Sequence, residues 1–292
     1  MKIATAAYSL DWLDSWAQYE DKLARWVSEA AGQGADLLVF PEYGAMELST
    51  LGGAEAARDL EGSIHAVSDR MEGAAELHAR LAVEHGVHIL GASGPVAVPD
   101  GRPVNRAEFF SPQGGRDHQD KQIMTRFERE DWLIAPGGPL KLFDTALGRI
   151  GVLICYDSEF PLLGRALREA DLILVPSCTE ALAGYSRVRI GAMARALENQ
   201  CVTVMSSIVG SYDWSESVDR NVGRGGIFGP PDRGFPETGV LAEGQLNQPG
   251  WTYAEIDLEA IAHVRADGVV LNRRHWAEQN GRSESVTNSD LR

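Results

Sequence analysis

Apolar residues along this chain follow two alternating patterns: short continuous runs, and longer segments in which they recur every three or four positions. Residues 2–8 form a run of the first kind and are predicted to be a buried strand. A helix is predicted next, from apolar residues at Tyr19, Leu23, Trp26, Val27 and Ala30. Glycines at 32 and 34 end that helix before the apolar run 36–40, so this part of the chain is predicted to form a β-α-β unit.

The same alternation continues along the rest of the chain. A second long helix is predicted from Ile64, Val67, Met71, Ala74 and Leu81, ending at Gly86 before a strand over 87–90. Later strands are predicted over 149–154, 171–176 and 201–207, with helices near 161–169 and 184–199 between them. Further β character is present over 106–110, 140–143, 226–228 and 251–256.

Strands that are apolar on both faces and alternate with helices indicate a sheet covered by helices, hence an α/β fold. No Pro/Gly/Ser-rich linker divides the chain, which favours a single large domain with two sheets. Periodicity is lost over 267–292, where the sequence becomes polar. We expect a C-terminal tail over 266–292 that wraps a neighbouring subunit or stays mobile.

Charge and composition limit the partners. The 27 basic and 42 acidic residues among 292 give a net charge of -15, which repels nucleic acid and anionic lipid. No run reaches the roughly 20 apolar residues needed to cross a bilayer, and acidic residues interrupt the N-terminal segment where a signal peptide would be apolar. We therefore expect a cytoplasmic protein that binds neither nucleic acid nor membrane.

Several kinds of site are disfavoured. Three cysteines without a C-x-x-C pair indicate neither a disulfide framework nor a thiolate zinc site, and the seven histidines are scattered, so we expect no metal. A nucleotide-binding protein is disfavoured because there is no G-x-x-x-x-G-K, and the pair Gly32 and Gly34 precedes a strand. A serine hydrolase is disfavoured because there is no G-x-S-x-G. We expect no cofactor.

Three residues remain as candidates for chemistry. Glu42 follows a predicted strand, where α/β sheets collect ligands, although a solvated loop acid is the ordinary interpretation. Cys155 lies where an apolar strand ends and a helix begins, a position that favours a thiolate, although most such cysteines are small core residues. Lys121 lies among acids, normally a weak surface pair, but only four of the 27 basic residues are lysines, which makes each of them notable.

The order and separation of Glu42, Lys121 and Cys155 resemble the Glu-Lys-Cys triad of the nitrilase superfamily of carbon-nitrogen hydrolases, over about residues 1–265. The resemblance implies that Cys155 is the nucleophile, Glu42 the general base, and Lys121 the cation beside the tetrahedral intermediate. It also implies a second glutamate ahead of a Pro-Gly pair. Counting back from Pro136 points to Glu130, with Glu128 as the fallback.

The resemblance further implies a four-layer α-β-β-α sandwich in a single domain. The backbone N–H of Tyr156 would help to hold the oxyanion. Other residues expected in the substrate pocket are Tyr43, Trp132, Glu159, Cys178 and Thr179. Cys201, which begins a predicted strand, is expected in the core. Where many short-chain amidases have an arginine this chain has Glu159, which disfavours a dicarboxylate monoamide as substrate.

The implied reaction is hydrolysis of a small amide to a carboxylic acid and ammonia or an amine, through a Cys155 thioester. The same triad also serves nitrile hydrolysis and acyl transfer, which stay open as alternatives. The sequence is most similar to a poorly characterised branch, some of whose members carry an additional acetyltransferase domain. An alternative outside the enzymes is a catalytically silent α/β scaffold. By resemblance we expect a homodimer or larger oligomer, with contacts from the helices that begin near 161 and 184.

Overall fold

The strand β1 (Lys2–Tyr8) lies at the centre of the fold, in a computed structural model that describes all residues 1–292. It pairs in parallel with β2 (Leu37–Val39) and β10 (Val202–Ile208). It also pairs antiparallel with β15 (Gly250–Glu255). The main strand order is β4-β5-β3-β2-β1-β10-β9-β8-β7. Strand β1 therefore joins two halves of a continuous β structure.

Each half contributes one sheet layer. The half before β1 in this order contains β3 (His88–Leu90), β4 (Gly94–Val96), β5 (Val104–Phe110) and β6 (Arg116–Asp120). The other half contains β7 (Leu142–Thr145), β8 (Gly148–Val152), β9 (Leu172–Ser177), β13 (Gly226–Phe228) and β14 (Val240–Glu243). A separate small hairpin is formed by β11 (Gly210–Ser211) and β12 (Arg220–Asn221).

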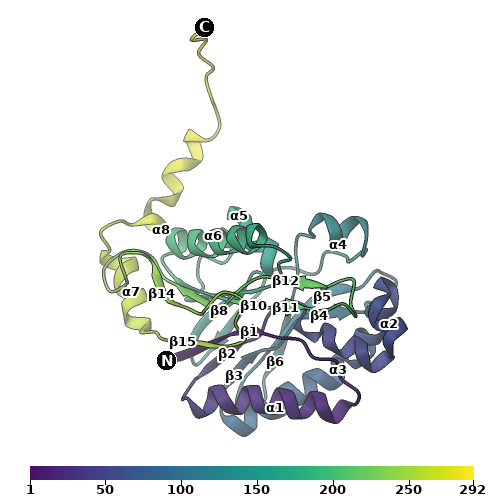
Figure 1. Cartoon of the computed structure of the whole chain (residues 1–292). Coiled ribbons are helices and arrows are strands. Elements are labelled where there is room, and N and C mark those ends of the chain that lie inside the picture. The colour runs from purple at the N-terminus through teal and green to yellow at the C-terminus, as the bar shows by residue number, and fades with distance from the viewer.

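Helices cover the outer face of each layer (Figure 1). The helices α1 (Trp16–Gly32) and α3 (Leu60–His85) lie on one side. On the opposite side lie α5 (Pro161–Ala166) and α6 (Leu182–Asn199). The expected α-β-β-α arrangement in one domain is confirmed by this order of layers and by its match to solved structures of the same fold.

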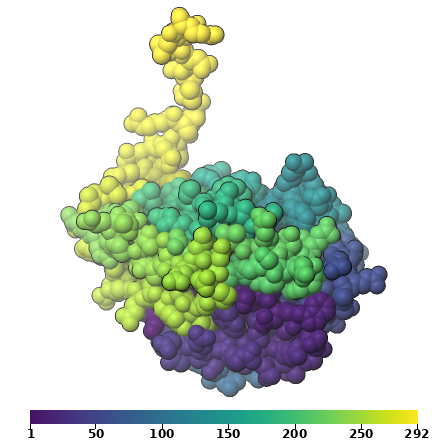
Figure 2. All heavy atoms as spheres, viewed as in Figure 1, coloured from purple at the N-terminus to yellow at the C-terminus, as the bar shows by residue number.

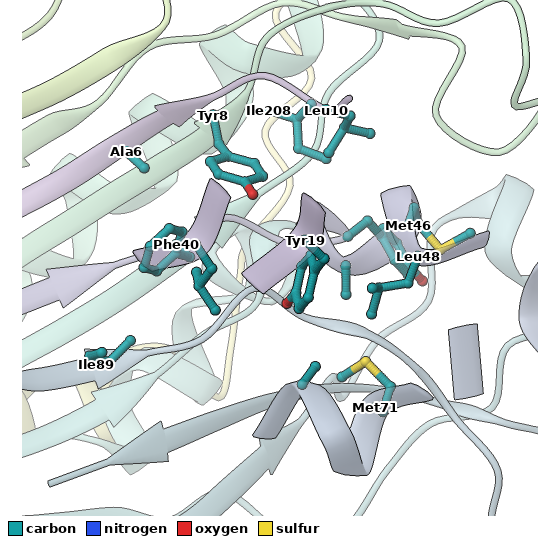
Figure 3. Close-up of a cluster of buried hydrophobic side chains, with 14 of the residues drawn as sticks. Ala6, Tyr8, Leu10, Tyr19, Phe40, Met46, Leu48, Met71, Ile89 and Ile208 are labelled. Atoms are coloured by element: carbon teal, nitrogen blue, oxygen red, sulfur yellow. The ribbon is translucent and has the colours of Figure 1, made fainter. Parts of the chain in front are cut away.

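Side-chain alternation along β2 shows how one strand serves two cores. Leu38 and Phe40 pack in a cluster with α1 and α3, whereas Leu37 and Val39 pack in a second cluster with residues of the other sheet. Successive residues of a strand point to opposite faces, so an uninterrupted apolar run is needed when both faces are buried. Figure 3 shows part of the first cluster, in which Tyr8, Phe40 and Ile89 converge from neighbouring strands.

The shorter elements were not evident from periodicity. They are η1 (Gly44–Gly52), α2 (Ala54–Arg58), α4 (Arg126–Glu130), η2 (Cys155–Glu159), α7 (Leu258–Asp267), α8 (Asn272–His275) and η3 (Trp276–Arg282). Helix α7 packs Ile261 and Val264 into the body, so the expected boundary at residue 265 falls within its last turn. Beyond α7 the chain extends away from the body (Figures 1 and 2). No helix is both long and apolar enough to span a membrane.

Candidate active site

Four strands that run in the same direction deliver the candidate residues to one pocket of about 350 Å³. Glu42 follows β2, Lys121 follows β6, Cys155 follows β8 and Cys178 follows β9. Because these strands are mutually parallel, their carboxyl ends meet at the same edge of the β structure, where α/β folds bind ligands. The structure thus brings together the three residues that were predicted from widely separated stretches.

Lys121 is the centre of the site. Its side chain is 1% exposed, and its Nζ lies 2.7 Å from Glu42 Oε1 and 2.7 Å from both carboxylate oxygens of Glu128. Burial by itself lowers the pKa of a lysine, but the charges of Glu128 and Glu42 outweigh that effect and hold the pKa of Lys121 well above its usual value. The ammonium ion is therefore fixed between two carboxylates.

Glu42 is held by groups from three segments besides its own. Its Oε1 accepts from Lys121 and, at 3.0 Å, from Asn105 Nδ2. Its Oε2 accepts from the backbone N–H of Cys178 at 2.9 Å. Burial raises the pKa of Glu42 to about 7, with Glu128 adding to the rise and Lys121 opposing it. A carboxylate with that pKa can accept a proton near neutrality and release it again.

The second glutamate beside the lysine is Glu128, and the expectation of Glu130 is wrong. Thr125 caps α4 through a capping box in which Glu128 is the third residue, so the Glu128 carboxylate bonds back to Thr125 N–H at 2.8 Å. Glu130 lies two residues further on, about 200° around the helix. It points to solvent, with its side chain 52% exposed and paired with Arg126 at 2.7 Å. The T-x-x-E pattern at 125–128 was the sequence signal for the correct residue.

Cys155 begins η2 with a backbone φ of 49°, a left-handed conformation that few non-glycine residues adopt. Its Sγ lies 3.7 Å from the carbonyl oxygen of Cys178, the residue whose N–H contacts Glu42. Burial, and then the charge of Glu42, raise the pKa of the Cys155 thiol well above its usual value. Burial thus opposes the thiolate that the start of η2 would favour, and Glu42 is the neighbouring carboxylate that can take the thiol proton.

Comparison with known proteins places the chain in a family. The sequence matches the model of the carbon-nitrogen hydrolase family over residues 2–266. The chain belongs to this family. This membership agrees with the hydrolase of carbon-nitrogen bonds that the triad pattern predicts.

Relatives in this family are similar to the chain over most of its length. It is 33% identical to the probable hydrolase YhcX of Bacillus subtilis over 92% of the chain, and spans 52% of that longer relative. It is 25% identical to an omega-amidase of Danio rerio, over 85% of the chain and 86% of the relative. Among solved structures, a carbon-nitrogen hydrolase from Helicobacter pylori shares the fold with a TM-score of 0.78 at 17% identity, covering 98% of both chains.

Asp157 is a buried carboxylate beside the candidate site that sequence reasoning did not single out. It accepts backbone N–H groups from Ile123 at 2.8 Å, from Gln122 at 3.1 Å and from Ile154 at 3.2 Å. These residues immediately follow Lys121 and immediately precede Cys155. Burial raises the pKa of Asp157 to about 6. One side chain therefore ties the segment of the lysine to the segment of the thiol.

The remaining predicted site residues all line the pocket: Tyr43, Trp132, Tyr156, Glu159, Cys178 and Thr179. Tyr43 donates from its hydroxyl to Glu128 at 2.6 Å, and the Trp132 ring packs 4.7 Å from the Tyr43 ring. Glu159 pairs with Arg187 at 3.5 Å. Cys201 lies in the core, as expected.

Two parts of the pocket wall were missed. They are residues 216–221, which lead into and include β12, and residues of α6 such as Val188. Residues 216–221 are mostly polar and carry no motif, and an apolar helix residue such as Val188 is typical of a core position, so neither segment was predicted to line the pocket. No group of three or more His, Cys, Asp or Glu side chains is arranged to hold a metal ion.

Proposed function

We propose that this protein hydrolyses the carbon-nitrogen bond of a small amide, with Cys155 as nucleophile, Glu42 as general base and Lys121 as the stabilising cation. The observation that carries the proposal is the position of Lys121 Nζ, 2.7 Å from both Glu42 and Glu128, in the pocket that also holds Cys155. Nucleophile, proton carrier and cation are the three groups that acyl transfer to a thiol requires.

In the first half of the reaction, Cys155 Sγ bonds to the amide carbon while its proton moves to Glu42. The carbonyl oxygen becomes an oxyanion, which Lys121 and the backbone N–H of Tyr156 stabilise. Glu42 then gives the proton to the amide nitrogen, the carbon-nitrogen bond breaks, and ammonia or an amine leaves. The raised pKa of Glu42, about 7, suits a group that must both take and return this proton.

In the second half, water attacks the thioester carbon and Glu42 takes one of its protons. The carbon-sulfur bond breaks, the carboxylic acid leaves, and the proton returns from Glu42 to the Cys155 sulfur. Glu128 does not touch the reacting atoms in this scheme. It orients Lys121 through two hydrogen bonds of 2.7 Å and limits the ammonium to the neighbourhood of the oxyanion.

The pocket charges support a substrate without a negative charge. Near the opening, Glu159 is paired with Arg187, whereas Glu180, Glu216 and Asp219 have no cationic partner within 4.0 Å. Arg220 is the one lining cation near them that is not paired. An excess of carboxylates along a cleft raises the local concentration of cations and lowers that of anions. This agrees with the sequence-based expectation that a dicarboxylate monoamide is disfavoured.

The catalytic proposal is tested by ammonia release from a library of small amides and the matching nitriles, with the wild type and two variants. Cys155→Ala should abolish turnover, and Lys121→Ala should lower kcat by about two orders of magnitude or more, the usual effect of losing an oxyanion donor. Cys201→Ala, which changes a buried cysteine that does not line the pocket, and Lys141→Ala are the matched controls. Wild-type turnover by Cys155→Ala would show that the nucleophile is wrong.

The substrate proposal is tested with three amides of equal chain length that end in an ammonium, a methyl or a carboxylate group. We expect the highest kcat/KM for the ammonium compound and the lowest for the carboxylate, with the difference shrinking as salt is added. Preference for the carboxylate compound would contradict the charge argument but leave the triad intact. Ammonia release from nitriles in preference to amides would identify the protein as a nitrile hydrolase.

We also propose that the chain forms a homodimer through α5 and α6. The large apolar side chains exposed on these helices are Leu162, Leu182, Ile190 and Leu197, and Ile190 is 65% exposed. Clustered exposed apolar residues are typical of protein interfaces. Light scattering should give twice the chain mass for the wild type and a shift toward monomer for Ile190→Glu. Removing residues 283–292 tests whether the C-terminal tail contributes. A wild type that is monomeric at micromolar concentration would refute this.

A further inference from the structure

Two buried polar residues lie behind Glu42 and have no part in the reaction scheme. Asn105 is the second residue of β5, and Ser93 lies between β3 and β4. Both are 0% exposed. Polar side chains buried this deeply need hydrogen-bond partners. The partners of Asn105 and Ser93 form a chain that ends on the Glu42 carboxylate.

This chain of hydrogen bonds has a fixed direction. The backbone N–H of Tyr43 donates to Ser93 Oγ at 3.0 Å, and the Ser93 hydroxyl donates to Asn105 Oδ1 at 2.7 Å. Asn105 Nδ2 then donates to Glu42 Oε1 at 3.0 Å. An ionised carboxylate can only accept, so the amide must turn its NH₂ group to Glu42 and its oxygen to Ser93, whose hydroxyl donates to that oxygen and accepts the Tyr43 N–H.

The backbones of the same two residues hold the neighbouring catalytic segments. Ser93 donates its N–H to the Pro41 carbonyl at 3.1 Å and accepts the Ala45 N–H at 3.2 Å, which clamps the turn that carries Glu42. The Asn105 carbonyl accepts the Lys121 N–H at 2.9 Å. Asn105 therefore contacts the base through its side chain and the lysine through its backbone.

A count of acceptor positions shows what this contact achieves. Each carboxylate oxygen has two lone pairs. Both positions on Glu42 Oε1 are used, by Lys121 Nζ and Asn105 Nδ2, and one on Oε2 is used by the Cys178 N–H. The position left is on Oε2, the oxygen next to the Cys178 peptide, whose carbonyl contacts the Cys155 thiol.

We propose that Asn105, oriented by Ser93, is a positioning residue that keeps Glu42 ionised and turns Oε2 toward the Cys155 thiol. The inference rests on the proposed role of Glu42 as general base. The titratable groups that face Glu42 are its neighbour Tyr43, Lys121 after β6, Glu128 on α4, Cys155 in η2 and Cys178 after β9. Asn105 differs from all of them because it donates to the carboxylate without carrying a charge or titrating.

The direction of the effect follows from which form of Glu42 the amide stabilises. A donor to a carboxylate favours the ionised form, so losing that donor raises the pKa of Glu42. Glu42 must be ionised to take the thiol proton, so thiol reactivity appears as pH rises through that pKa. In Asn105→Leu the pH at which the thiol becomes reactive should increase by about one unit or more. That shift corresponds to the usual free energy of a hydrogen bond to a charged group.

The test measures alkylation of Cys155 by iodoacetamide between pH 5 and 9 in the full-length protein, followed by mass spectrometry of the Cys155 peptide. Asn105→Leu should shift the midpoint of the rate upward, and Ser93→Ala should shift it by less in the same direction. With an amide substrate, kcat of Asn105→Leu at pH 7 should fall more than its KM changes. Asn199→Leu is the matched control, because Asn199 is equally buried but bonds to the Gly164 carbonyl at 3.1 Å. Asn199→Leu should lower Tm without moving the pH midpoint of Cys155 alkylation.

A folded Asn105→Leu with the wild-type midpoint overturns the proposal. If Asn105→Leu does not fold, Ser93→Ala decides, and an unshifted midpoint in that variant overturns it equally. A wild type whose alkylation shows no inflection near pH 7 refutes Glu42 as the base, and the role of Asn105 falls with it. The wild-type profile thus separates failure of the proposed function from failure of this inference.

Discussion

Replacing Glu128 by glutamine removes one of the two charges that hold Lys121, with almost no change of shape. The Glu42 and Glu128 oxygens each lie 2.7 Å from the same nitrogen, so the two carboxylates are close neighbours. Two unit charges about 5 Å apart interact by about 3 kcal/mol at an effective dielectric constant of about 20. Without the Glu128 charge the pKa of Glu42 should fall, by up to about two units.

The expected result is an acid limb of kcat/KM that moves to lower pH, together with a lower kcat because Glu42 becomes a weaker base. Stability should also fall, because removing one partner of a buried pair commonly costs about 3–5 kcal/mol, although Lys121 keeps Glu42 as a second partner. The assays are a pH profile with an accepted amide and thermal unfolding. Glu130→Gln is the matched control and should change neither, since its carboxylate is exposed.

Two results would refute this reasoning. An unmoved acid limb in Glu128→Gln would show that Glu128 does not act on Glu42 through charge. A change of the same size in kcat/KM and Tm in Glu130→Gln would show that Glu130 is the functional glutamate. The direction is also diagnostic, because losing the Asn105 donor should move the same limb to higher pH.

Three further outcomes follow from the buried polar groups. Asp157→Asn should cost about 1–3 kcal/mol in chemical unfolding and lower kcat more than it alters KM; an unchanged kcat would show that the tie between the Lys121 and Cys155 segments is not needed. Lys22→Met should destabilise by about 3–5 kcal/mol, because it strands a buried Glu47, whereas Lys141→Met on the surface should cost under about 1 kcal/mol; equal losses in urea would contradict this. Burial raises the pKa of Glu42 from its ordinary 4.5 to about 7, so the folded state binds more protons than the unfolded state in that window. Stability from Glu42 is therefore lost as pH rises from about 5 to 7, and Glu42→Gln should gain Tm relative to wild type over that range; a constant difference would refute this.

The regular elements could be predicted because burial on both faces leaves a continuous apolar signal. The predicted strand 2–8 coincides with β1, and the predicted helix over 184–199 lies within α6. By contrast, α4 is five residues long and is held by the Thr125 capping box, and η1 is buried on nearly every side, with both polar and apolar residues in the interior. Their sequences therefore lack the periodicity that identifies helices.

The three triad residues could be predicted from the sequence, but the buried residues that hold them in place could not. Glu42 and Cys155 each follow a strand that the apolar pattern predicts, whereas Lys121 follows the polar strand β6, and its signal was the scarcity of lysine. Asn105 and Asp157 act through side-chain contacts to residues 63 and 35 positions away, respectively. No local pattern encodes such a contact. The error over Glu130 had a similar origin, because counting from a Pro-Gly pair ignores which face of α4 each glutamate occupies.

The environments of the four lysines show what the scarcity of lysine could and could not predict. Of the four lysines, Lys121 and Lys22 are both buried, and Lys22 bonds to Glu47 and the Ser9 carbonyl at 2.6 Å each and pairs with Asp11 at 3.1 Å. An arginine carries five donors in a rigid plane, whereas an ammonium has three that a few close oxygens satisfy completely. At these two positions a lysine fits a small buried cage of acceptors, whereas Lys2 and Lys141 are not buried. Only Lys121 has a thiol beside its cage, so burial explains the choice of lysine at both positions, and the neighbouring Cys155 distinguishes the candidate catalytic one.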